Sequence, residues 1–326
     1  MATSDTDEDL ALVALAMSDT DEELALVAIV AEKEEFEARR RCRRQCRAHL
    51  HATLAFDQSW LDMFRFSRQE IKRMARLFNI TPHENNDISP EHALCIFLRR
   101  MAYPNGLVDL EHLFGYSSTA LSKVCGDVLT HIHNKFKFLF RLSSLGWSRE
   151  DLGRFARAVE QKGASISCCV GFIDGTARQI CRPSTNQKYC YNGHKRKHGL
   201  KFQSLVAPNG LIAHLHAPLP ASRHDAYVLS DSKLLQDVVD AFDGGNFVIY
   251  GDPAYGRQQY LLSPFKGSRL TAQQERFNAT MSKKLQLQPV GTMYKVAVLL
   301  ANVWTCMNKG NQTSKFFFFL GYHLRP

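Results

Sequence analysis

The pattern of hydrophobic and polar positions changes about halfway along the chain. Between residues 54 and 140, apolar residues recur every three or four positions, which is the period of amphipathic helices. From residue 165 onward, short apolar runs end in glycine, proline or aspartate, which is typical of buried strands separated by turns. The pattern therefore predicts an all-helical region followed by a mixed α/β domain.

In the helical region, the motif Ser67-Arg-Gln-Glu70 is a capping box that begins a helix. The helices that the period predicts cover residues 67–78, 91–101, 108–114 and 119–138. The last two are joined by the turn Gly115-Tyr-Ser-Ser118, which gives the layout of a helix-turn-helix. Ser118 and Lys123 near the start of the last helix are candidates for DNA contacts, and a generic helical bundle is the alternative.

In the second half, the predicted strands cover residues 170–174, 202–206, 212–216 and 247–250, and an amphipathic helix covers residues 225–239. The second and third strands form a hairpin around Pro208-Asn-Gly210. The order strand, hairpin, helix, strand would bring the last strand alongside the first.

Two aspartates stand at the ends of the first and last of these strands. They are found in Val170-Gly-Phe-Ile-Asp-Gly-Thr176 and Phe247-Val-Ile-Tyr-Gly-Asp-Pro-Ala-Tyr-Gly256. Two neighbouring carboxylates repel each other unless a cation lies between them. Asp174 and Asp252 are therefore candidate catalytic residues and ligands of a divalent metal, as in two-metal phosphodiester cleavage. The alternative is that each aspartate only begins a turn.

Charge is distributed unevenly along the chain, whose formal net charge is +9. Residues 1–37 contain twelve acidic side chains and one lysine, and the remainder contains 40 basic and 20 acidic side chains. A basic body of this kind favours a polyanion such as DNA as its partner. The basic side chains nearest the predicted carboxylates are candidates for nucleic-acid binding: Lys188, His194, Lys195, Arg196, Lys197, Lys201 and Arg223.

Residues 1–53 form an acidic repeat followed by an arginine-rich arm, which we expect to be flexible. Ser4-Asp-Thr-Asp-Glu-Asp-Leu-Ala-Leu-Val-Ala-Leu15 recurs almost unchanged from Ser18. The repeat could bind a protein partner or be a helix without one. The six arginines between Arg39 and Arg47 fit a nuclear-import signal or a phosphate-binding arm, and equally a helix paired with nearby glutamates. No apolar stretch has the roughly 20 residues of a membrane span, so we expect no membrane partner.

Several segments of the second half, taken in order, resemble the DDE nuclease domain of PIF/Harbinger-type transposases. They are Asp174-Gly-Thr176, Tyr191-Asn-Gly-His-Lys-Arg-Lys-His-Gly-Leu-Lys-Phe-Gln203, Pro208-Asn-Gly-Leu-Ile212, Ser222-Arg-His-Asp225 and Gly251-Asp-Pro-Ala-Tyr-Gly256. The resemblance covers about residues 165–326. It implies an α/β ribonuclease-H-like fold and a nuclease that cuts DNA with a divalent cation, Mg²⁺ or Mn²⁺. The family's first two catalytic acids match Asp174 and Asp252.

The family's third acid, a glutamate on a later helix, has no counterpart here. Leu270-Thr-Ala-Gln-Gln-Glu-Arg-Phe-Asn-Ala-Thr-Met-Ser282 resembles the segment before that helix and passes directly into the segment after it. Glu275 is the last acidic residue of the chain and matches a position before the missing helix. Asp225, beside Arg223 and His224, could cap the following helix or add a carboxylate to the metal site, and we favour the cap.

The domains expected from the sequence are residues 1–53, a helical region at 54–145 that we expect to bind DNA, and a truncated DDE nuclease-like domain at 165–326. Together they predict a transposase-derived, metal-dependent endonuclease-like protein whose catalysis is impaired. We expect it in the nucleus, and a fraction in the cytoplasm is compatible with the sequence. The alternative is a non-catalytic domesticated transposase protein that binds DNA or a protein partner.

Overall fold

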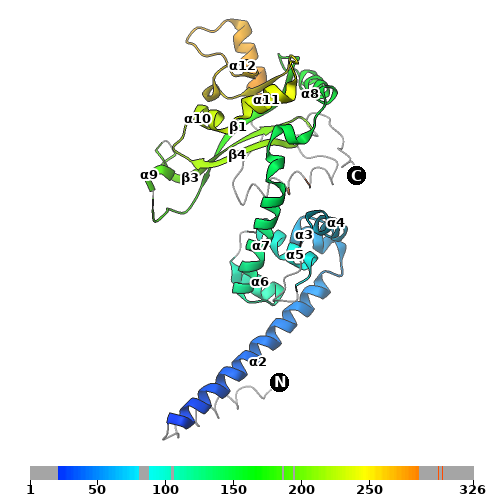
Figure 1. The fold of residues 1–326 in the computed structure, drawn as a ribbon, viewed down its shortest axis with the longest axis vertical. Helices are drawn as coiled ribbons and strands as arrows, with labels where there is room; N and C mark the ends of the chain where they lie inside the picture. The colour runs from blue at the N-terminus through cyan, green and yellow to red at the C-terminus, as the bar shows by residue number, and fades with distance from the viewer. Residues whose placement is uncertain are drawn as a thin grey trace. The chain divides into compact units, whose positions relative to one another are not determined.

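The computed structural model describes residues 21–80, 88–103, 106–185, 187–193 and 195–285, together with residues 300 and 303. The chain divides into two compact units, residues 1–128 and 129–326 (Figure 1). In the described part of the chain, no helix is both long enough and apolar enough to span a membrane.

The first unit is built from helices, as predicted. They are α2 (Asp21–Thr53), α3 (Asp57–Phe64), α4 (Arg68–Phe78), α5 (Pro90–Ala102), α6 (Leu107–Phe114) and the first part of α7 (Ser118–Phe136). The arginine-rich segment is part of α2, where Arg39 pairs with Glu35. The core of the unit contains the buried side chains of Phe64, Met74 and Phe97.

The start of α4 confirms the predicted capping box. The Ser67 hydroxyl accepts a hydrogen bond from the backbone N–H of Glu70 at 3.3 Å, and the Glu70 carboxylate accepts one from the backbone N–H of Ser67 at 2.7 Å. These bonds satisfy two of the N–H groups that a helix start leaves without partners.

The predicted helix-turn-helix layout is present, and α2 covers its turn. Gly115 has a φ of +66°, and a Cβ at this position would lie 2.3 Å from the carbonyl oxygen of Arg43 in α2. From the same helix, Arg47 donates a hydrogen bond to the Gly115 carbonyl at 3.3 Å and lies over the ring of Tyr116. Glycine is therefore required here both by the left-handed backbone and by the close approach of α2.

The second unit contains a mixed sheet. In the described residues its strands are β1 (Cys169–Gln179), β2 (Tyr191–Asn192), β3 (Lys197–Val206), β4 (Ile212–Pro220), β5 (Val248–Gly251) and β6 (Leu261–Leu262). The order is β2-β3-β1-β5-β6, with β4 paired to β3. The hairpin β3–β4 is antiparallel, and β1 and β5 are parallel. The predicted strands and their pairing are confirmed, but the expected end of the first strand at Asp174 is wrong, because pairing with β3 continues β1 to Gln179 and leaves Asp174 within the strand.

Helices cover the sheet on both faces. They are η1 (Lys137–Phe140), η2 (Leu142–Leu145), α8 (Arg149–Gln161), α9 (Gln187–Cys190), α10 (Asp225–Ser232), α11 (Leu234–Phe242), η3 (Pro253–Tyr255) and α12 (Ala272–Leu285). Helices α10 and α11 pack against the face that carries Ile249, whereas α12 packs through Met281 against the face that carries Val248 and Tyr250. Figure 1 shows α9 at the end of the sheet where β3 begins.

One predicted helix is interrupted. The segment 225–239 is divided into α10 and α11 at Lys233, whose φ is +53°. The buried Ser232 hydroxyl stabilises this break, because it donates to the Leu229 carbonyl at 2.7 Å and accepts from the Leu234 N–H at 3.2 Å. Apolar periodicity continues through the break and therefore did not reveal it.

Helix α8 lies between the predicted regions 54–145 and 165–326. It packs on β1 and contributes Leu152, Phe155 and Val159 to the core of the second unit. Its start is a second capping box, in which the Ser148 hydroxyl accepts from the Asp151 N–H at 3.2 Å. The serine and aspartate of this capping box are visible in the sequence, so the start of α8 could have been predicted from them.

Candidate carboxylate site

Asp174 and Asp252 are brought together by the parallel pairing of β1 and β5. In this ladder Ile173 is paired with Gly251, so the two aspartates are the next residues on the two neighbouring strands. Neighbouring strands lie about 4.8 Å apart. The Asp252 carboxylate accepts a hydrogen bond from the Ala254 N–H at 2.9 Å and so begins η3, and the Asp174 carboxylate accepts one from the Gly175 N–H at 2.9 Å.

Burial and mutual repulsion disfavour the ionised forms of these two groups. Burial is the main cause that raises the pKa of Asp174 to about 6; the charges of Asp252 and Asp225 act in the same direction, and the Gly175 N–H and Lys195 oppose them. Burial also raises the pKa of Asp252, with Asp225 acting in the same direction. Three aspartates therefore share one electrostatic environment.

Asp225 is the third of these aspartates, and it does not cap α10. The N-cap residue of α10 is His224, which makes no side-chain cap, and Asp225 is the first residue of the helix. Its Oδ1 atom lies 3.1 Å from the ammonium nitrogen of Lys201 on β3. The predicted cap is wrong because the Asp225 carboxylate is turned toward a buried lysine instead of toward its own helix.

The space around Asp225 is narrow. A Cβ on Gly175 would lie 2.2 Å from Asp225 Oδ1, so glycine is needed to admit this carboxylate beside β1. The hydroxyl of Tyr255 would lie 3.0 Å from that same Cβ. Both Asp225 Oδ1 and the Tyr255 hydroxyl are buried without a hydrogen bond, so the Lys201–Asp225 contact is an ion pair without hydrogen-bond geometry.

Tyr255 was not predicted as a site residue. Its side chain is 2 % exposed, and burial, followed by the charges of Asp225, Asp174 and Asp252, raises its pKa. The hydroxyl is therefore neutral and can donate a hydrogen bond to a carboxylate or to a ligand. The signal in the sequence was its place in Gly251-Asp-Pro-Ala-Tyr255, three residues after Asp252.

Glu275 is not among the charges that mainly determine the pKa values of this site, namely those of Asp174, Asp252 and Tyr255. It is exposed in the first turn of α12. Asp225, by contrast, shifts the pKa of all three.

The donor set suits a hard divalent cation, because it consists of carboxylates with a buried oxygen that lacks a hydrogen bond. Within the residues that the structure describes, however, no group of three or more histidine, cysteine, aspartate or glutamate side chains is gathered so that it could hold a metal ion. The Lys201 ammonium provides the positive charge next to Asp225.

A cavity of about 460 Å³ adjoins the carboxylates on the side of β2 and β3. Its lining combines Asp225 and Gly175 with predicted nucleic-acid-binding residues, namely Lys195, Lys201 and Arg223. Lys188, Arg196 and Lys197 are exposed on α9, on the turn before β3 and at the start of β3. His194 lies outside the described residues.

Ser118 and Lys123 belong to α7 and thus to the helix-turn-helix. The backbone N–H of Ser118 is bonded to the carboxylate of Glu111, which lowers the Glu111 pKa. The Glu111 carboxylate therefore occupies an N–H group at the start of α7, a position that can also bind anions in other helices. Lys123 is exposed one turn further along.

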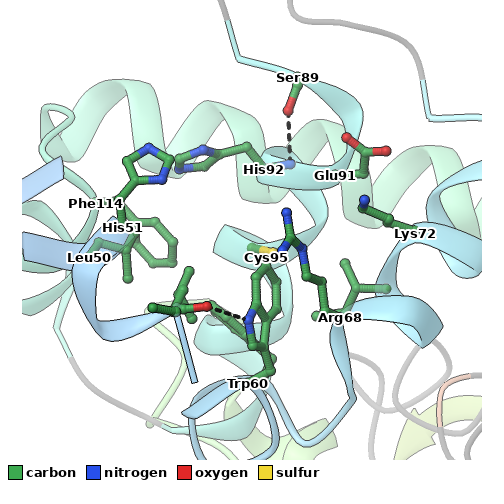
Figure 2. A pocket seen from close by; sticks show the side chains of 14 residues that line it. Leu50, His51, Trp60, Arg68, Lys72, Ser89, Glu91, His92, Cys95 and Phe114 are labelled. Atoms are coloured by element: carbon green, nitrogen blue, oxygen red, sulfur yellow. Dashed lines mark hydrogen bonds between the residues drawn. The ribbon is translucent and has the colours of Figure 1, made fainter. Parts of the chain in front are cut away.

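The helical unit contains a second cavity, of about 300 Å³. Figure 2 shows Trp60, Arg68, His92 and Phe114 around it, with the Trp60 indole donating to the Leu54 carbonyl at 2.9 Å. Its walls are mainly apolar, and Glu91 is the single carboxylate among the lining residues. Although this cavity is well formed, it lacks the groups that phosphodiester chemistry requires.

Residues 173–308 match the family model of the DDE superfamily endonucleases. The matched segment begins one residue before Asp174 and includes Asp225, Asp252 and Glu275. No curated protein and no solved structure matches the chain.

Proposed function

We propose that the second unit is a Harbinger-type, transposase-derived DNA endonuclease-like domain that depends on a divalent cation and whose cleavage activity is impaired. The observation that carries this proposal is the placement of Asp174 and Asp252 at matching positions of two parallel strands, with Asp225 beside them. The endonuclease family match over the same residues supports it.

The sheet order supports a ribonuclease-H-like fold. A long antiparallel hairpin, β3–β4, lies on one side of β1 and the parallel strand β5 lies on the other. This arrangement places the end of β5 beside the middle of β1, where the carboxylates are needed.

Asp174 and Asp252 would hold the cation, and Asp225 would join them only where the cation displaces Lys201 from its carboxylate. A divalent cation bound there would supply Lewis-acid stabilisation of a phosphate and would lower the pKa of a water molecule. The chain itself supplies the negative charge that attracts the ion and, through Lys195 and Arg223 in the adjoining cavity, positive charge for phosphate groups.

Two observations support impaired cleavage. Glu275 is exposed on α12 and is not among the main charges acting on the aspartates. Asp225 is engaged by Lys201, so the cation must compete with an ammonium group for this ligand. Misplacing one ligand of a two-metal site misplaces the reacting groups, and small errors of position reduce the rate strongly.

A non-catalytic DNA-binding protein is the second candidate. The exposed basic side chains of α9, of the start of β3 and of Arg223 before α10 favour it, because they need no metal to bind phosphates. The helix-turn-helix of the first unit would contribute through Ser118 and Lys123. Location in the nucleus and a protein partner for the acidic repeat are part of the same proposal.

A nicking assay on supercoiled DNA with Mn²⁺ tests the proposal when it is combined with Mn²⁺ titration. We expect the chain to bind Mn²⁺ and DNA and to cleave little, and Asp174→Asn to remove Mn²⁺ binding. Robust cleavage that Asp252→Ala and Glu275→Gln both abolish would show that Glu275 completes the site and that activity is intact. DNA binding without any Mn²⁺ binding would favour the non-catalytic candidate.

A further inference from the structure

We propose that Tyr189, Tyr191 and Tyr227 form an aromatic surface beside the carboxylate site that stacks on the bases of an unpaired DNA strand. This inference rests on the proposed function, because it names the form of DNA that the same site accepts. Tyr191 begins one of the segments that resemble the family, but none of the three tyrosines was predicted as a site residue.

The three rings are unusually exposed for aromatic side chains. Tyr189, Tyr191 and Tyr227 are 59 %, 42 % and 44 % exposed, whereas Tyr250 and Tyr255 of the same unit are almost fully buried. Exposed aromatic rings gain little within the fold, so they are available to cover the face of a ligand.

Local contacts tie two of these rings to the cavity of about 460 Å³. Tyr191 lines that cavity and is paired across β2 and β3 with His198, the two ring centroids being 5.3 Å apart. The carbonyl oxygen of Tyr189 accepts a hydrogen bond from the Ser222 hydroxyl at 2.9 Å. The side chain of Asn192 donates to the Ala221 carbonyl at 2.8 Å, so β2 is fixed to the segment that precedes Asp225.

Tyr227 is linked to the same cavity through Arg223, which is one of its lining residues. It lies on α10, and the guanidinium of Arg223 lies 4.6 Å from its ring centroid. Arg223 lines the cavity and is exposed. An arginine held against a ring presents a flat cation next to a flat aromatic face, which suits a phosphate and its neighbouring base.

These rings stand among exposed cations, namely Lys188, Lys195, Arg196 and Lys197. Alternating cations and aromatic rings are typical of surfaces that bind single strands, because the cations follow the backbone and each ring stacks on a base. In a duplex, the faces of the bases are covered by their neighbours and cannot be reached by a tyrosine. The surface therefore fits unpaired DNA better than an intact helix.

The test compares the binding of a fluorescently labelled 20-nucleotide single strand with that of a 20-base-pair duplex to the full chain. We expect Tyr191→Ala and Tyr227→Ala each to weaken single-strand binding roughly tenfold, since stacking is worth about 1–3 kcal/mol per base. Duplex binding and the salt dependence of both should be unchanged. Tyr191→Phe and Tyr227→Phe keep the rings and should bind like the parent, and thermal melts verify that all variants fold.

Two control variants separate stacking from other effects. Lys197→Ala should weaken both forms of DNA and reduce the salt slope, as expected for a phosphate contact. Phe138→Ala removes another exposed aromatic ring, on η1, and should leave binding unchanged.

The outcomes distinguish this inference from the proposed function. Provided that the parent chain binds DNA, two results would disprove stacking by the aromatic surface and leave the proposed function standing. In one, the alanine variants bind single strands as tightly as the parent; in the other, they lose affinity for duplex and single strand equally. If the parent chain binds neither form of DNA, the proposed function fails and this inference fails with it.

Discussion

The ammonium nitrogen of Lys201 lies 3.1 Å from Asp225 Oδ1, and both side chains are largely buried, at 11 % and 19 % exposed. The pair joins β3 to the first residue of α10. Lys201 also opposes the burial that raises the pKa of Asp252, whereas the cation that opposes the raised pKa of Asp174 is Lys195, so Lys201 offsets the repulsion at two of the three aspartates. The lysine thus takes, in part, the role that a metal ion has in a two-metal site.

The first prediction concerns removal of that cation. Lys201→Met leaves Asp225 without its partner, and breaking a buried pair costs roughly 3 kcal/mol. The metal-free variant should therefore melt at a lower temperature than the parent. It should bind Mn²⁺ about tenfold more tightly, a gain of about 1.4 kcal/mol, because the ion no longer competes with an ammonium group.

Thermal melts with and without Mn²⁺, together with calorimetric titration, measure both effects. Lys266→Met is the matched control, because Lys266 is exposed, and it should change neither quantity. Equal Mn²⁺ affinity in the Lys201 variant and the parent would show that Lys201 does not compete with the metal.

The second prediction concerns pH. The pKa of Asp174 is raised to about 6, so this group holds a proton at pH 5 and is ionised at pH 7.5. A metal binds the ionised carboxylate, and its affinity therefore falls as the pH drops below about 6. We expect Mn²⁺ to bind roughly tenfold more weakly at pH 5.0 than at pH 7.5. An affinity that stays constant over this range would contradict a role for Asp174 as a ligand.

The third prediction concerns stability and follows from the same raised pKa of Asp174. Ionisation of Asp174 favours metal binding, but it destabilises the metal-free fold. The folded-state pKa of Asp174 lies above that of the unfolded chain, so the folded state binds the proton more tightly. The stability that protonated Asp174 contributes is therefore fully present below about pH 4 and is lost as the pH rises through about 6. Asp174→Asn should stabilise the metal-free protein at pH 7 by about 1 kcal/mol, after allowance for solvent screening, and have little effect at pH 4.

Urea unfolding at the two pH values measures this difference, and the same variant should lose Mn²⁺ binding. A substitution that stabilises the fold while abolishing ligand binding is the behaviour expected of a functional residue. Destabilisation at pH 7 would instead indicate that the Asp174 carboxylate has a structural role within β1, where it accepts the hydrogen bond from the Gly175 N–H.

The sequence was informative where the physical cause is local. An apolar run indicates a buried strand, so the strands that carry Asp174 and lead to Asp252 could be predicted, as could the capping box at Ser67. The continuation of β1 past Asp174 to Gln179 could not be predicted, because it depends on pairing with the distant strand β3. The position of Asp225 could not, because a cap and an ion pair are both compatible with Ser222-Arg-His-Asp225. The choice between them is decided by Lys201, which is 24 positions away in the chain and reaches Asp225 only in the folded sheet.

The break between α10 and α11 was missed for a related reason. Leu229, Leu234 and Val238 are buried and keep an apolar face through the segment, so periodicity alone indicates a single helix. The break depends on the buried Ser232 hydroxyl, which also accepts a hydrogen bond from Gln203 on β3 at 2.9 Å. A tertiary contact, and not a helix-breaking residue, ends α10.

The last prediction tests whether the narrow space beside Asp225 matters. In Gly175→Ala the new Cβ would lie 2.2 Å from Asp225 Oδ1, which is closer than any non-bonded contact allows. The Asp225 carboxylate must move away, so the ion pair with Lys201 weakens and the third carboxylate leaves its place. We expect a loss of about 1–3 kcal/mol of stability and weaker Mn²⁺ binding, both measured by thermal melts with and without the metal. Gly193→Ala is the steric control, because a Cβ there meets nothing within 4 Å. If Gly175→Ala melts and responds to Mn²⁺ as Gly193→Ala does, Asp225 has room to move without consequence and is not part of the metal site.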